Sequence, residues 1–557
     1  MTTRTWHGHH LFLHSGTEDT DAFLVRSAAP LLDGLVAAEA DARWFFIRYG
    51  EGGPHLRFRV SGLSAAAAAE LPRELARSAG AVPRVPGPWP TRHGEVRAVE
   101  YVPETHRYGG ARALPVAEEV FAASTQVATE ALRALQGGKA GARLTLAADL
   151  AHATAHGLAM DRLTAARWLR RHAAGWRWVT DTELLPGASV HTRVNTVYAA
   201  QREALTRRAQ DLGQRLDADT AAPWTGRWAR QVREADERLR AGGAAGAGEA
   251  MGDDERAWVW ASQLHMLFNR LGVTPDEERA VCRLAARTLL ETDEPPAFFP
   301  AGHTAPDVQY LERSKFQIGR NEDAAPRPQP PRARPAGPET PLPADPLPPV
   351  ALGTVLADRH SVRGALGGPL DAATLGSLLW HALAETDSTG QLLADGSTRT
   401  AAHRPYPSAG ALYSARVRLL VLDVAGIPAG TYDCVPERRT LRRVGPAPTT
   451  AEIKALSTYL SRPATDPDWI GIDAVPVVAA VYADLALRHR YGLRALRLAL
   501  LETGHLTQTL LLTATALGLG GTPLGGFHDD LAHELLGLDD LQQPLQYLLP
   551  LGRRATR

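Results

Sequence analysis

PRPQPPRARPAGPETPLPADPLPP, residues 326–349, is the stretch that decides how this chain can fold, and it holds 11 of the chain's 40 prolines. Proline fixes φ and lacks the backbone N–H donor, so neither a helix nor a central strand can run through the stretch. We expect it to remain extended and solvated, as a semi-rigid spacer. The residues on its two sides must therefore fold separately, and each side needs its own functional account.

The length and charge of the chain limit its possible partners. At 557 residues there is room for two hydrophobic cores, and 44% hydrophobic residues is ordinary for a soluble protein. A formal net charge of zero argues against bulk binding to nucleic acid or membranes. The N-terminus lacks the apolar run of a signal peptide, and Glu502 and His505 interrupt the longest apolar stretch. We therefore expect a cytoplasmic protein with no membrane and no nucleic-acid partner.

Cysteine and histidine give no metal signature. Cys282 and Cys434 lie on opposite sides of the spacer, which is neither a disulfide framework nor a thiolate zinc site. A metal site near the N-terminus is conceivable, but no carboxylate or thiolate is spaced with the histidines there. These histidines are His7, His9, His10 and His14. We predict that they lie on a strand or at the chain terminus, and that the protein holds no metal.

Residues 43–60, RWFFIRYGEGGPHLRFRV, are typical of a β-hairpin. An aromatic and β-branched run is followed by a turn over Gly50–Pro54 and then by strict polar and apolar alternation. Alternation places His55, Arg57 and Arg59 on one face of the second strand, and the apolar residues on the other. The polar face is either a functional surface or a solvated outer face, and composition leaves both open.

Two further segments carry polar residues in this half of the chain. EYVPETHRYGG, residues 100–110, places Glu104 and Arg107 before two glycines, which by itself predicts only a turn. Residues from about 115 to 315 are mostly helical in pattern. In RAWVWASQLHMLFNRLGV, residues 256–273, His265 and Asn269 share a face apart from the apolar stripe. Such a histidine is by default structural. The stripe consists of Trp260, Leu264, Leu267 and Leu271.

The ordered motifs FFIRY, HLRFR, ETHRYGG and LHMLFNRLG resemble those of the lantibiotic-dehydratase C-terminal domain. This is the glutamate-elimination domain of tRNA-dependent peptide dehydratases, and the resemblance covers residues 1–315. It implies five catalytic residues: Arg57, Arg59, Glu104, Arg107 and His265. The same fold also hosts pyridine-forming cycloaddition enzymes, which generally do not keep this whole set, so the set favours elimination. A non-catalytic peptide-binding scaffold is the other alternative.

The chemistry of elimination explains these residue types. A glutamylated Ser or Thr must lose its Cα proton and its glutamate carboxylate. Arginines would stabilise the charge that develops on the amide oxygen and would bind carboxylates through two N–H groups. His265 would move the proton, as an acid or as a base, and Glu104 would orient an arginine. Because no glutamylation domain is recognised, we expect a separate tRNA-dependent glutamylation enzyme as a partner.

Residues after the spacer alternate helical and strand-like patterns. DRHSVRGALGGPL, residues 358–370, places two arginines and a serine where an anion site or a solvated charged turn are both reasonable. A helix capped near Asp371 follows, then two strands within residues 416–424 and 474–484, and a long helix over 491–518 that ends at Gly518. The Gly-rich loop 518–527 lacks the spacing of a dinucleotide-binding motif.

RHSVR, PSAGALY, RYGLRALR, GTPLGGF and LPLGRR resemble the nitroreductase superfamily, and specifically its SagB-type FMN-dependent azoline dehydrogenases. The resemblance covers residues 351–557. It implies that FMN phosphate and ribityl groups are held by Arg359, Ser361, Arg363 and Arg553. It also implies that Pro407, Ser408 and Gly410 approach the flavin ring, and that Leu524, Gly525 and Gly526 offer it backbone N–H groups.

One position departs from the family pattern. Where the family has a Lys-Tyr pair, this chain has Arg490 and Tyr491. Arginine stays protonated and cannot act as a base, so Tyr491 is the expected proton acceptor, with Arg490 favouring its ionised form. His489 is an alternative base.

These observations together predict an α+β protein with two domains, residues 1–320 for glutamate elimination and 351–557 for FMN-dependent azoline oxidation, joined by a linker over 321–350. The fusion resembles the bifunctional enzymes of lactazole-type thiopeptide pathways. Expected partners are a precursor peptide, an azoline-forming cyclodehydratase and a second copy bound through the C-terminal domain. A small-molecule nitroreductase remains an alternative for the second domain.

Overall fold

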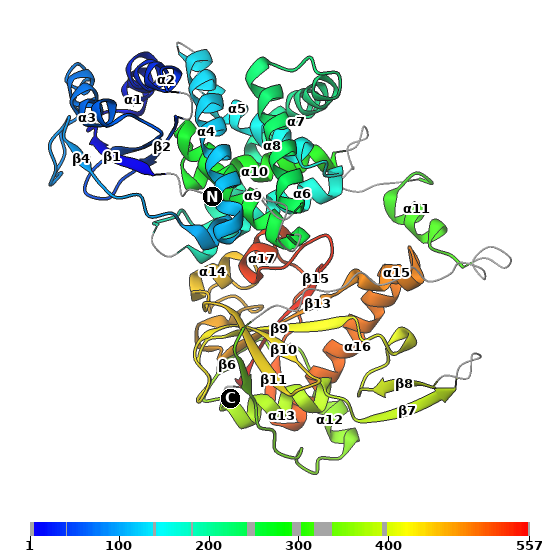
Figure 1. Cartoon of the computed structure of the whole chain (residues 1–557). Coiled ribbons are helices and arrows are strands. Elements are labelled where there is room, and N and C mark those ends of the chain that lie inside the picture. Colours follow the sequence, from blue (N-terminus) through cyan, green and yellow to red (C-terminus); the bar gives the residue numbers. More distant parts are fainter. Residues whose placement is uncertain are drawn as a thin grey trace. The chain divides into compact units, whose positions relative to one another are not determined.

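The computed structural model describes residues 5–39, 42–136, 141–179, 182–241, 251–291, 302–316, 337–392 and 398–554 (Figure 1). The chain divides into two compact units. The first contains residues 1–176 and 192–293, and the second contains residues 177–191 and 294–557. Both units combine helices with sheets, which confirms the predicted α+β class with two domains.

An antiparallel sheet forms one part of the first unit. Its strands are β1 (Trp6–Phe12), β2 (Arg43–Tyr49), β3 (His55–Ser61) and β4 (Val96–Ala98), in the order β2-β3-β1-β4. The predicted hairpin is therefore confirmed as β2 and β3. Leu56, Phe58 and Val60 are all buried in the hydrophobic core. This burial fixes which face of β3 is left for the arginines.

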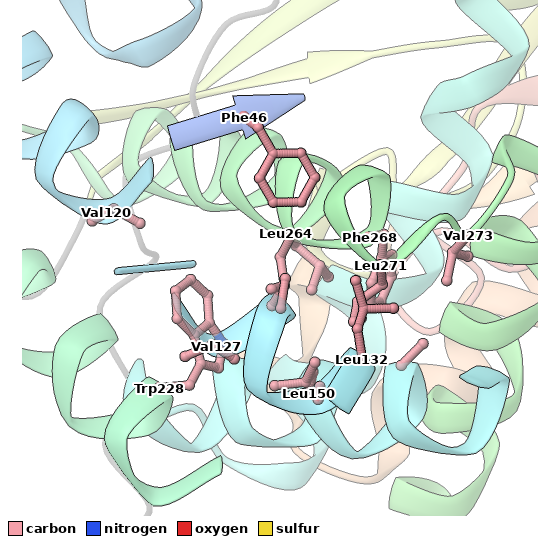
Figure 2. Close-up of a cluster of buried hydrophobic side chains, with 14 of the residues drawn as sticks. Phe46, Val120, Val127, Leu132, Leu150, Trp228, Leu264, Phe268, Leu271 and Val273 are labelled. Carbon is pink, nitrogen blue, oxygen red and sulfur yellow. The ribbon is translucent and has the colours of Figure 1, made fainter. Parts of the chain in front are cut away.

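Helices make up the rest of the first unit and supply most of its core. They are α1 (Thr17–Phe23), the π-helix η1 (Leu24–Ala28), α2 (Ala29–Ala37), α3 (Ala65–Ala79), the 3-10 helix η2 (Thr105–Tyr108), α4 (Gly110–Leu135), α5 (Ala142–Gly157), α6 (Arg162–Gly175), α8 (Pro223–Arg240), α9 (Asp253–Leu271) and α10 (Pro275–Leu290). The chain also forms η3 (Trp176–Trp178) and α7 (Gly187–Asp217). Figure 2 shows Leu264, Phe268 and Leu271 of α9 packed among core side chains that include Leu132 of α4.

Helix α9 is anchored at both ends. Its first turn carries three acidic residues that suit the positive end of the helix dipole, and it ends at Gly272 with φ of +73°. Arg48 Nε donates to the carbonyl of Arg270 at 3.1 Å, and Arg143 donates to the carbonyl of Leu271. Asp21 binds both arginines. The predicted apolar stripe is fully buried, so His265 is held in a defined position.

The second unit is built on a nine-stranded sheet in the order β12-β6-β15-β13-β9-β10-β11-β5, with β14 paired to β15. The strands are β5 (Glu339–Pro341), β6 (Gly364–Gly367), β9 (Ala415–Val421), β10 (Gly430–Val435), β11 (Thr440–Gly445), β12 (Ile470–Gly471), β13 (Val477–Ala483), β14 (Leu519–Gly521) and β15 (Leu545–Arg554). A separate hairpin consists of β7 (Asp387–Leu392) and β8 (Thr398–His403). Every residue of β13 is buried, as predicted for a central strand.

The helices of the second unit include the two that the sequence predicted, one of them with a later start. They are α11 (Pro306–Arg313), α12 (Leu352–Asp358), α13 (Ala372–Leu383), η4 (Ala409–Ala411), α14 (Thr450–Ala455), η5 (Ile472–Ala474), η6 (Leu485–Leu487), α15 (Arg488–Tyr491), α16 (Arg494–Ala516) and α17 (Asp529–Leu536). Asp371 caps α13 by accepting from the backbone N–H of Thr374, as predicted. The predicted helix over 491–518 instead begins at Arg494, because Gly492 has φ of +52° and ψ of −134°.

The expectation of a fully solvated proline-rich spacer is wrong for its second part. Glu339–Pro341 form edge strand β5, antiparallel to β11. Leu342 is only 4% exposed, and its carbonyl accepts from Trp380 Nε1 at 2.9 Å. Proline is tolerated on an edge strand because one side of that strand needs no N–H donor. Residues 317–336 lie outside the described part of the chain, so the spacer prediction stands as a prediction there.

Candidate active sites

The Arg57 and Arg59 face of β3 forms part of a sheet face that is largely buried. The register places Gly8 of β1 and Phe45 of β2 beside Arg59. A side chain at Gly8 would approach the Val99 carbonyl to 2.2 Å and Arg59 Nη1 to 3.4 Å, so glycine leaves room here. Arg59 is only 7% exposed. A solvated outer face, one of the two readings of the sequence, is therefore excluded for Arg59.

Arg59 is a buried cation that forms no salt bridge with any described residue. Its Nη1 donates to the Phe58 carbonyl at 3.0 Å, and its guanidinium carbon lies 5.6 Å from the centre of the Tyr101 ring. Burial and the charge of Arg57 lower the pKa of Arg59 to about 10. Its Nη2 lies 3.4 Å from His10 Nε2. Burial and the nearby arginines lower the pKa of His10 to about 3, so His10 is neutral and can accept from Arg59.

Arg57 is less enclosed than Arg59 and has more partners. Its Nε donates to His55 Nε2 at 3.0 Å, and its guanidinium carbon lies 3.4 Å from the centre of the Tyr49 ring. The carboxylate of Glu51, which is largely exposed, lies 3.5 Å away. Arg57 can therefore exchange its ion pair with the exposed Glu51 for one with a ligand, whereas Arg59 has no ion pair with a described residue.

The turn that carries Glu104 and Arg107 reaches α9. Glu104 Oε2 lies 3.3 Å from Arg107 Nη1, and Arg107 Nε donates to Ser262 Oγ at 3.3 Å. Gly109 adopts φ of +81°, a conformation that favours glycine and lets α4 begin immediately afterwards. Ser262 lies about one helical turn before His265 on α9, so Arg107 contacts this helix close to His265.

His265 is oriented by a buried carboxylate that sequence reasoning missed. Its Nδ1 lies 2.9 Å from Glu278 Oε2, and the Trp176 ring packs edge-on at 4.9 Å between ring centres. The other oxygen of Glu278 lies 2.5 Å from His172 Nε2. Burial raises the pKa of Glu278, but attraction and hydrogen bonding to the two histidines outweigh it and hold the pKa well below its ordinary value. With Nδ1 committed to a carboxylate, Nε2 of His265 is left for substrate.

Glu278 left a signal in the sequence. It shares the buried face of α10 with Val281, Cys282 and Ala285, at helical spacing, and all four are buried. A glutamate on an apolar helix face requires a partner, because an unpaired buried carboxylate is strongly unfavourable. The identity of that partner has no local signature, since His172 lies 106 residues earlier.

An aromatic cluster lies next to predicted catalytic residues of the first unit. It contains Phe45, Tyr108, Ala117, Phe121, Trp6, Tyr101 and Met266. Tyr101 contacts Arg59, Tyr108 follows Arg107, and Met266 follows His265 in the chain. Across the described residues, no hydrogen bond or ion pair joins Arg57 or Arg59 directly to Arg107 or His265. The cluster thus contacts Arg59 through Tyr101, whereas Arg107 and His265 are related to it only as chain neighbours of Tyr108 and Met266.

The residues predicted to bind an anion in the second unit lie on or next to neighbouring strands. Ser361 pairs with Gly521 of β14, and Gly367 of β6 pairs with Arg553 at the end of β15. Arg363 lies 3.5 Å from Asp468, and Arg553 donates to the Pro369 carbonyl at 3.2 Å. Together with Arg359, these exposed or half-buried guanidinium groups fit the phosphate of FMN, because arginine forks match phosphate oxygens.

The loop predicted to approach the flavin ring is held by a buried glutamate. Glu502 of α16 is 2% exposed and accepts from Ser408 Oγ at 2.7 Å, Ser414 Oγ at 3.1 Å and the backbone N–H of Ala415 at 2.8 Å. The sequence shows Glu502 as a charge within an apolar helix, which was used only to exclude a membrane span. Ser408 therefore positions the loop through Glu502.

Tyr491 lies directly against this loop. A side chain at Gly410 would approach the Tyr491 hydroxyl to 2.5 Å. Gly410 also has φ of +61°, so both the nearby hydroxyl and the backbone conformation favour glycine here. The Arg490 guanidinium carbon lies 5.6 Å from the centre of the Tyr491 ring. His489, the alternative base, has its Nδ1 bonded to the Ala486 carbonyl. Residues predicted from two distant motifs, 404–413 and 490–497, thus meet.

The prediction that Leu524 offers its backbone N–H to a flavin is wrong. That N–H already donates to the Leu548 carbonyl at 2.8 Å, in a bridge between the loop and β15. A donor used within the fold cannot also serve a ligand. The N–H groups of Gly525 and Gly526 have no such bond within the described residues, so they stay as candidates.

A metal centre and a membrane-spanning helix are both absent from the described residues. They contain no group of three or more His, Cys, Asp or Glu side chains placed to hold a metal ion. Within the same part of the chain, no helix has the length and apolar character needed to cross a membrane.

Comparison with known proteins assigns each unit to a family model. Residues 6–289 match the C-terminal domain of the lantibiotic biosynthesis dehydratase, and residues 356–553 match the nitroreductase family. MJ1384 of Methanocaldococcus jannaschii, described as a nitroreductase, is 32% identical over 37% of this chain and 92% of its own length. The microcin B17-processing protein McbC of Escherichia coli is 31% identical over 30% of this chain and 57% of its own length.

A solved structure also resembles the first unit. The pyridine synthase TbtD from thiomuracin biosynthesis is 25% identical, with 51% of this chain and 97% of that chain covered and a TM-score of 0.39.

Proposed function

Because this chain belongs to the lantibiotic biosynthesis dehydratase C-terminal family over residues 6–289 and to the nitroreductase family over residues 356–553, we propose that it is a bifunctional enzyme that tailors a ribosomally made peptide of thiopeptide type. Residues 1–320 eliminate glutamate from glutamylated Ser or Thr, giving dehydroalanine or dehydrobutyrine. Residues 351–557 oxidise thiazoline or oxazoline to thiazole or oxazole. The linker predicted over residues 321–350 connects the two modules.

The observation that carries the elimination activity is the pairing of His265 with Glu278, together with the buried guanidinium group of Arg59, which has no carboxylate partner among the described residues. In the proposed reaction, His265 Nε2 takes the Cα proton while Glu278 stabilises the resulting imidazolium. Arg57 and Arg59 stabilise negative charge on the neighbouring amide oxygen. The Cβ–O bond breaks and glutamate leaves with the bonding electron pair, so its new carboxylate needs a cationic partner such as Arg107.

Azoline oxidation rests on the contact between Tyr491 and the loop at Gly410. FMN, when bound, supplies the two-electron acceptor for this module. Arg359, Arg363 and Arg553 would hold its phosphate, and Gly525 and Gly526 would donate backbone N–H groups. Tyr491 would take the ring proton of the azoline. Similarity to McbC, a protein that processes microcin B17, supports a peptide as the substrate.

Several partners follow from this proposal. Glutamylated Ser or Thr must come from a separate tRNA-dependent glutamylation enzyme, and azolines must come from a cyclodehydratase, both acting on the same precursor peptide in the cytoplasm. A homodimer through the second unit is supported by exposed leucines on and beside α12 and α16. These are Leu352 (66% exposed), Leu356 (54%), Leu493 (57%) and Leu501 (60%). Burying such a surface favours association.

Mass spectrometry of a glutamylated, thiazoline-bearing peptide tests both activities together. The wild-type protein should remove glutamate and, separately, two hydrogens. His265→Ala should lose only the first activity, and Tyr491→Phe only the second. Loss of both in either variant would show that the modules are not independent.

Three other outcomes would point to different functions. Cyclisation of a doubly dehydrated peptide without glutamate release would indicate pyridine formation. No chemistry by the first module, with peptide binding retained, would indicate a scaffold. Rapid NAD(P)H oxidation without loss of two hydrogens from the peptide would indicate a small-molecule nitroreductase.

A further inference from the structure

Arg270 is a fully buried arginine for which the proposed chemistry gives no use. It lies on α9, five residues after His265, and is 0% exposed. Its Nε donates to Thr125 Oγ1 at 3.0 Å, but Nη1 and Nη2 are buried without a hydrogen-bond partner. Its guanidinium carbon lies 5.9 Å from the centre of the Phe45 ring and 5.5 Å from that of Phe121. The guanidinium group of Arg270 therefore packs against these two aromatic rings.

Two other buried or largely buried arginines of the first unit have acidic partners, whereas Arg59, like Arg270, has none among the described residues. Arg256, on the same helix, lies 2.7 Å from Asp236, and Arg48 binds Asp21. Arg270 forms no salt bridge with any residue that the structure describes. Burial lowers the pKa of Arg270 to about 9, which leaves it cationic at neutral pH. Burying a charge without a partner is costly, so the arrangement calls for a compensating role.

The position of Arg270 suggests what that role is. Phe45 and Phe121, which it contacts, belong to the aromatic cluster, and so do Tyr101 and Tyr108. Tyr101 in turn lies beneath Arg59. The cluster therefore contacts two guanidinium groups, those of Arg270 and Arg59, that form no ion pair with a described residue, while Glu118 hydrogen-bonds to Tyr101. Aromatic rings screen charge far less than water does, so a cation behind them still attracts an anion in front of them.

We propose that Arg270 is a positioning residue that makes the aromatic cluster attractive to a carboxylate, namely that of the glutamyl group or of the glutamate released from it. This inference rests on the proposed elimination activity and deepens it. An internal acid beside Arg270 would cancel the potential, which explains why the fold keeps this guanidinium unpaired. Arg270 acts through the electrostatic field and through the placement of Phe45 and Phe121, without touching the substrate.

The test uses the full-length protein with Arg270→Met, Arg270→Lys and Arg256→Met. Removing an unpaired buried cation should raise the midpoint of thermal unfolding for Arg270→Met. The same variant should release glutamate with kcat/KM lowered on the order of tenfold, as expected for losing one charge at about 10 Å in an intermediate dielectric. Arg270→Lys, which keeps the charge, should recover most of this loss. Arg256→Met breaks a paired arginine and should lower the unfolding midpoint while glutamate release stays within about twofold.

For Arg270→Met we expect a higher unfolding midpoint and a lower kcat/KM. Replacing a merely structural arginine would not change stability and activity in opposite directions. The proposal is overturned if Arg270→Met releases glutamate at the wild-type rate, if it unfolds more easily than wild type, or if Arg270→Lys fails to recover activity. A second readout is the rise in unfolding midpoint caused by free L-glutamate, which should be smaller in Arg270→Met than in wild type. If the wild-type protein releases no glutamate, the proposed function fails, and this second readout still decides the role of Arg270.

Discussion

Two arginines of the first unit, Arg59 and Arg270, are buried, whereas Arg363 and Arg553 of the second unit's site face solvent. Arg59 and Arg270 are 7% and 0% exposed and bind no carboxylate among the described residues. The side chain of Arg363 is 43% exposed and lies beside Asp468, and Arg553 is exposed as well. Buried charges act strongly on a reacting group because little water screens them. Exposed arginines act on a ligand that brings its own charge, which suits a phosphate.

The two units also differ in the partners of their buried glutamates. Glu278 of the first unit binds two imidazoles, and Glu502 of the second binds two hydroxyl groups and a backbone N–H. An imidazole can carry a proton, so Glu278 is tied to proton transfer. Hydroxyl and amide groups keep their protons at neutral pH, so Glu502 holds a loop in place. One residue type thus serves chemistry in one unit and geometry in the other, according to its partners.

The largest effect is expected for His265→Ala. Loss of a positioned proton carrier should lower glutamate release by about 10²–10⁴-fold. Azoline oxidation should stay within about twofold of wild type, because His265 belongs to the first unit. Liquid chromatography with mass spectrometry follows both reactions in one sample. His156→Ala is the matched control, since His156 is paired with Asp217 and lies outside the proposed site; it should leave glutamate release unchanged.

Glu278→Gln tests whether this carboxylate is charged in the folded protein. Removing one partner of a buried pair should lower the free energy of unfolding at pH 7 by about 3 kcal/mol. The pKa of Glu278 is lowered on folding, so its stabilising contribution is present above the ordinary glutamate pKa of about 4.3 and is lost as the pH falls further. The difference between wild type and variant should therefore shrink below about pH 4. Calorimetric scans from pH 3 to 8 measure it, and a difference independent of pH would contradict the charged state.

Glu502→Gln should affect the second unit alone. The variant weakens charge-assisted bonds to Ser408 and Ser414, each worth about 1.5–3 kcal/mol, so FMN should bind on the order of tenfold more weakly. Glutamate release should be unchanged. Flavin fluorescence titration gives the affinity. Glu339→Gln, which alters a glutamate bound to Arg438 on the edge of the sheet, is the control and should bind FMN normally. Normal FMN binding by Glu502→Gln would mean that the loop does not need its anchor.

The smallest effect is expected from shortening the spacer within residues 326–335. Each separate activity should remain within about twofold, because neither candidate site includes these residues. Conversion of a peptide that needs both activities should slow by only a few fold, roughly what a change of effective concentration produces. A time course of doubly modified peptide measures it. Loss of one separate activity would show that the segment belongs to that module.

Sequence patterns predicted the parts of the two sites that depend on local periodicity. Alternation over residues 55–60 placed Arg57 and Arg59 on one face, and helical spacing placed His265 away from the stripe of α9. Interruptions of a helix were not predicted by these patterns. Gly492 interrupts a helix that the apolar pattern carried through, since glycine is compatible with a helix interior as well as with its end. Strand β5 was missed because proline content signalled only the absence of a helix or central strand.

By itself the sequence determined the two families to which the halves of the chain belong, and which residues can carry charge or move a proton. Those properties follow from composition, periodicity and motif order along the chain. Only the tertiary structure decided that Glu278 and His172 meet at His265, that Glu502 anchors the loop at Ser408, and that Arg270 is buried without an acid. Partners such as these come from helices and strands far apart in the chain, and local periodicity defines a face without defining what packs against it.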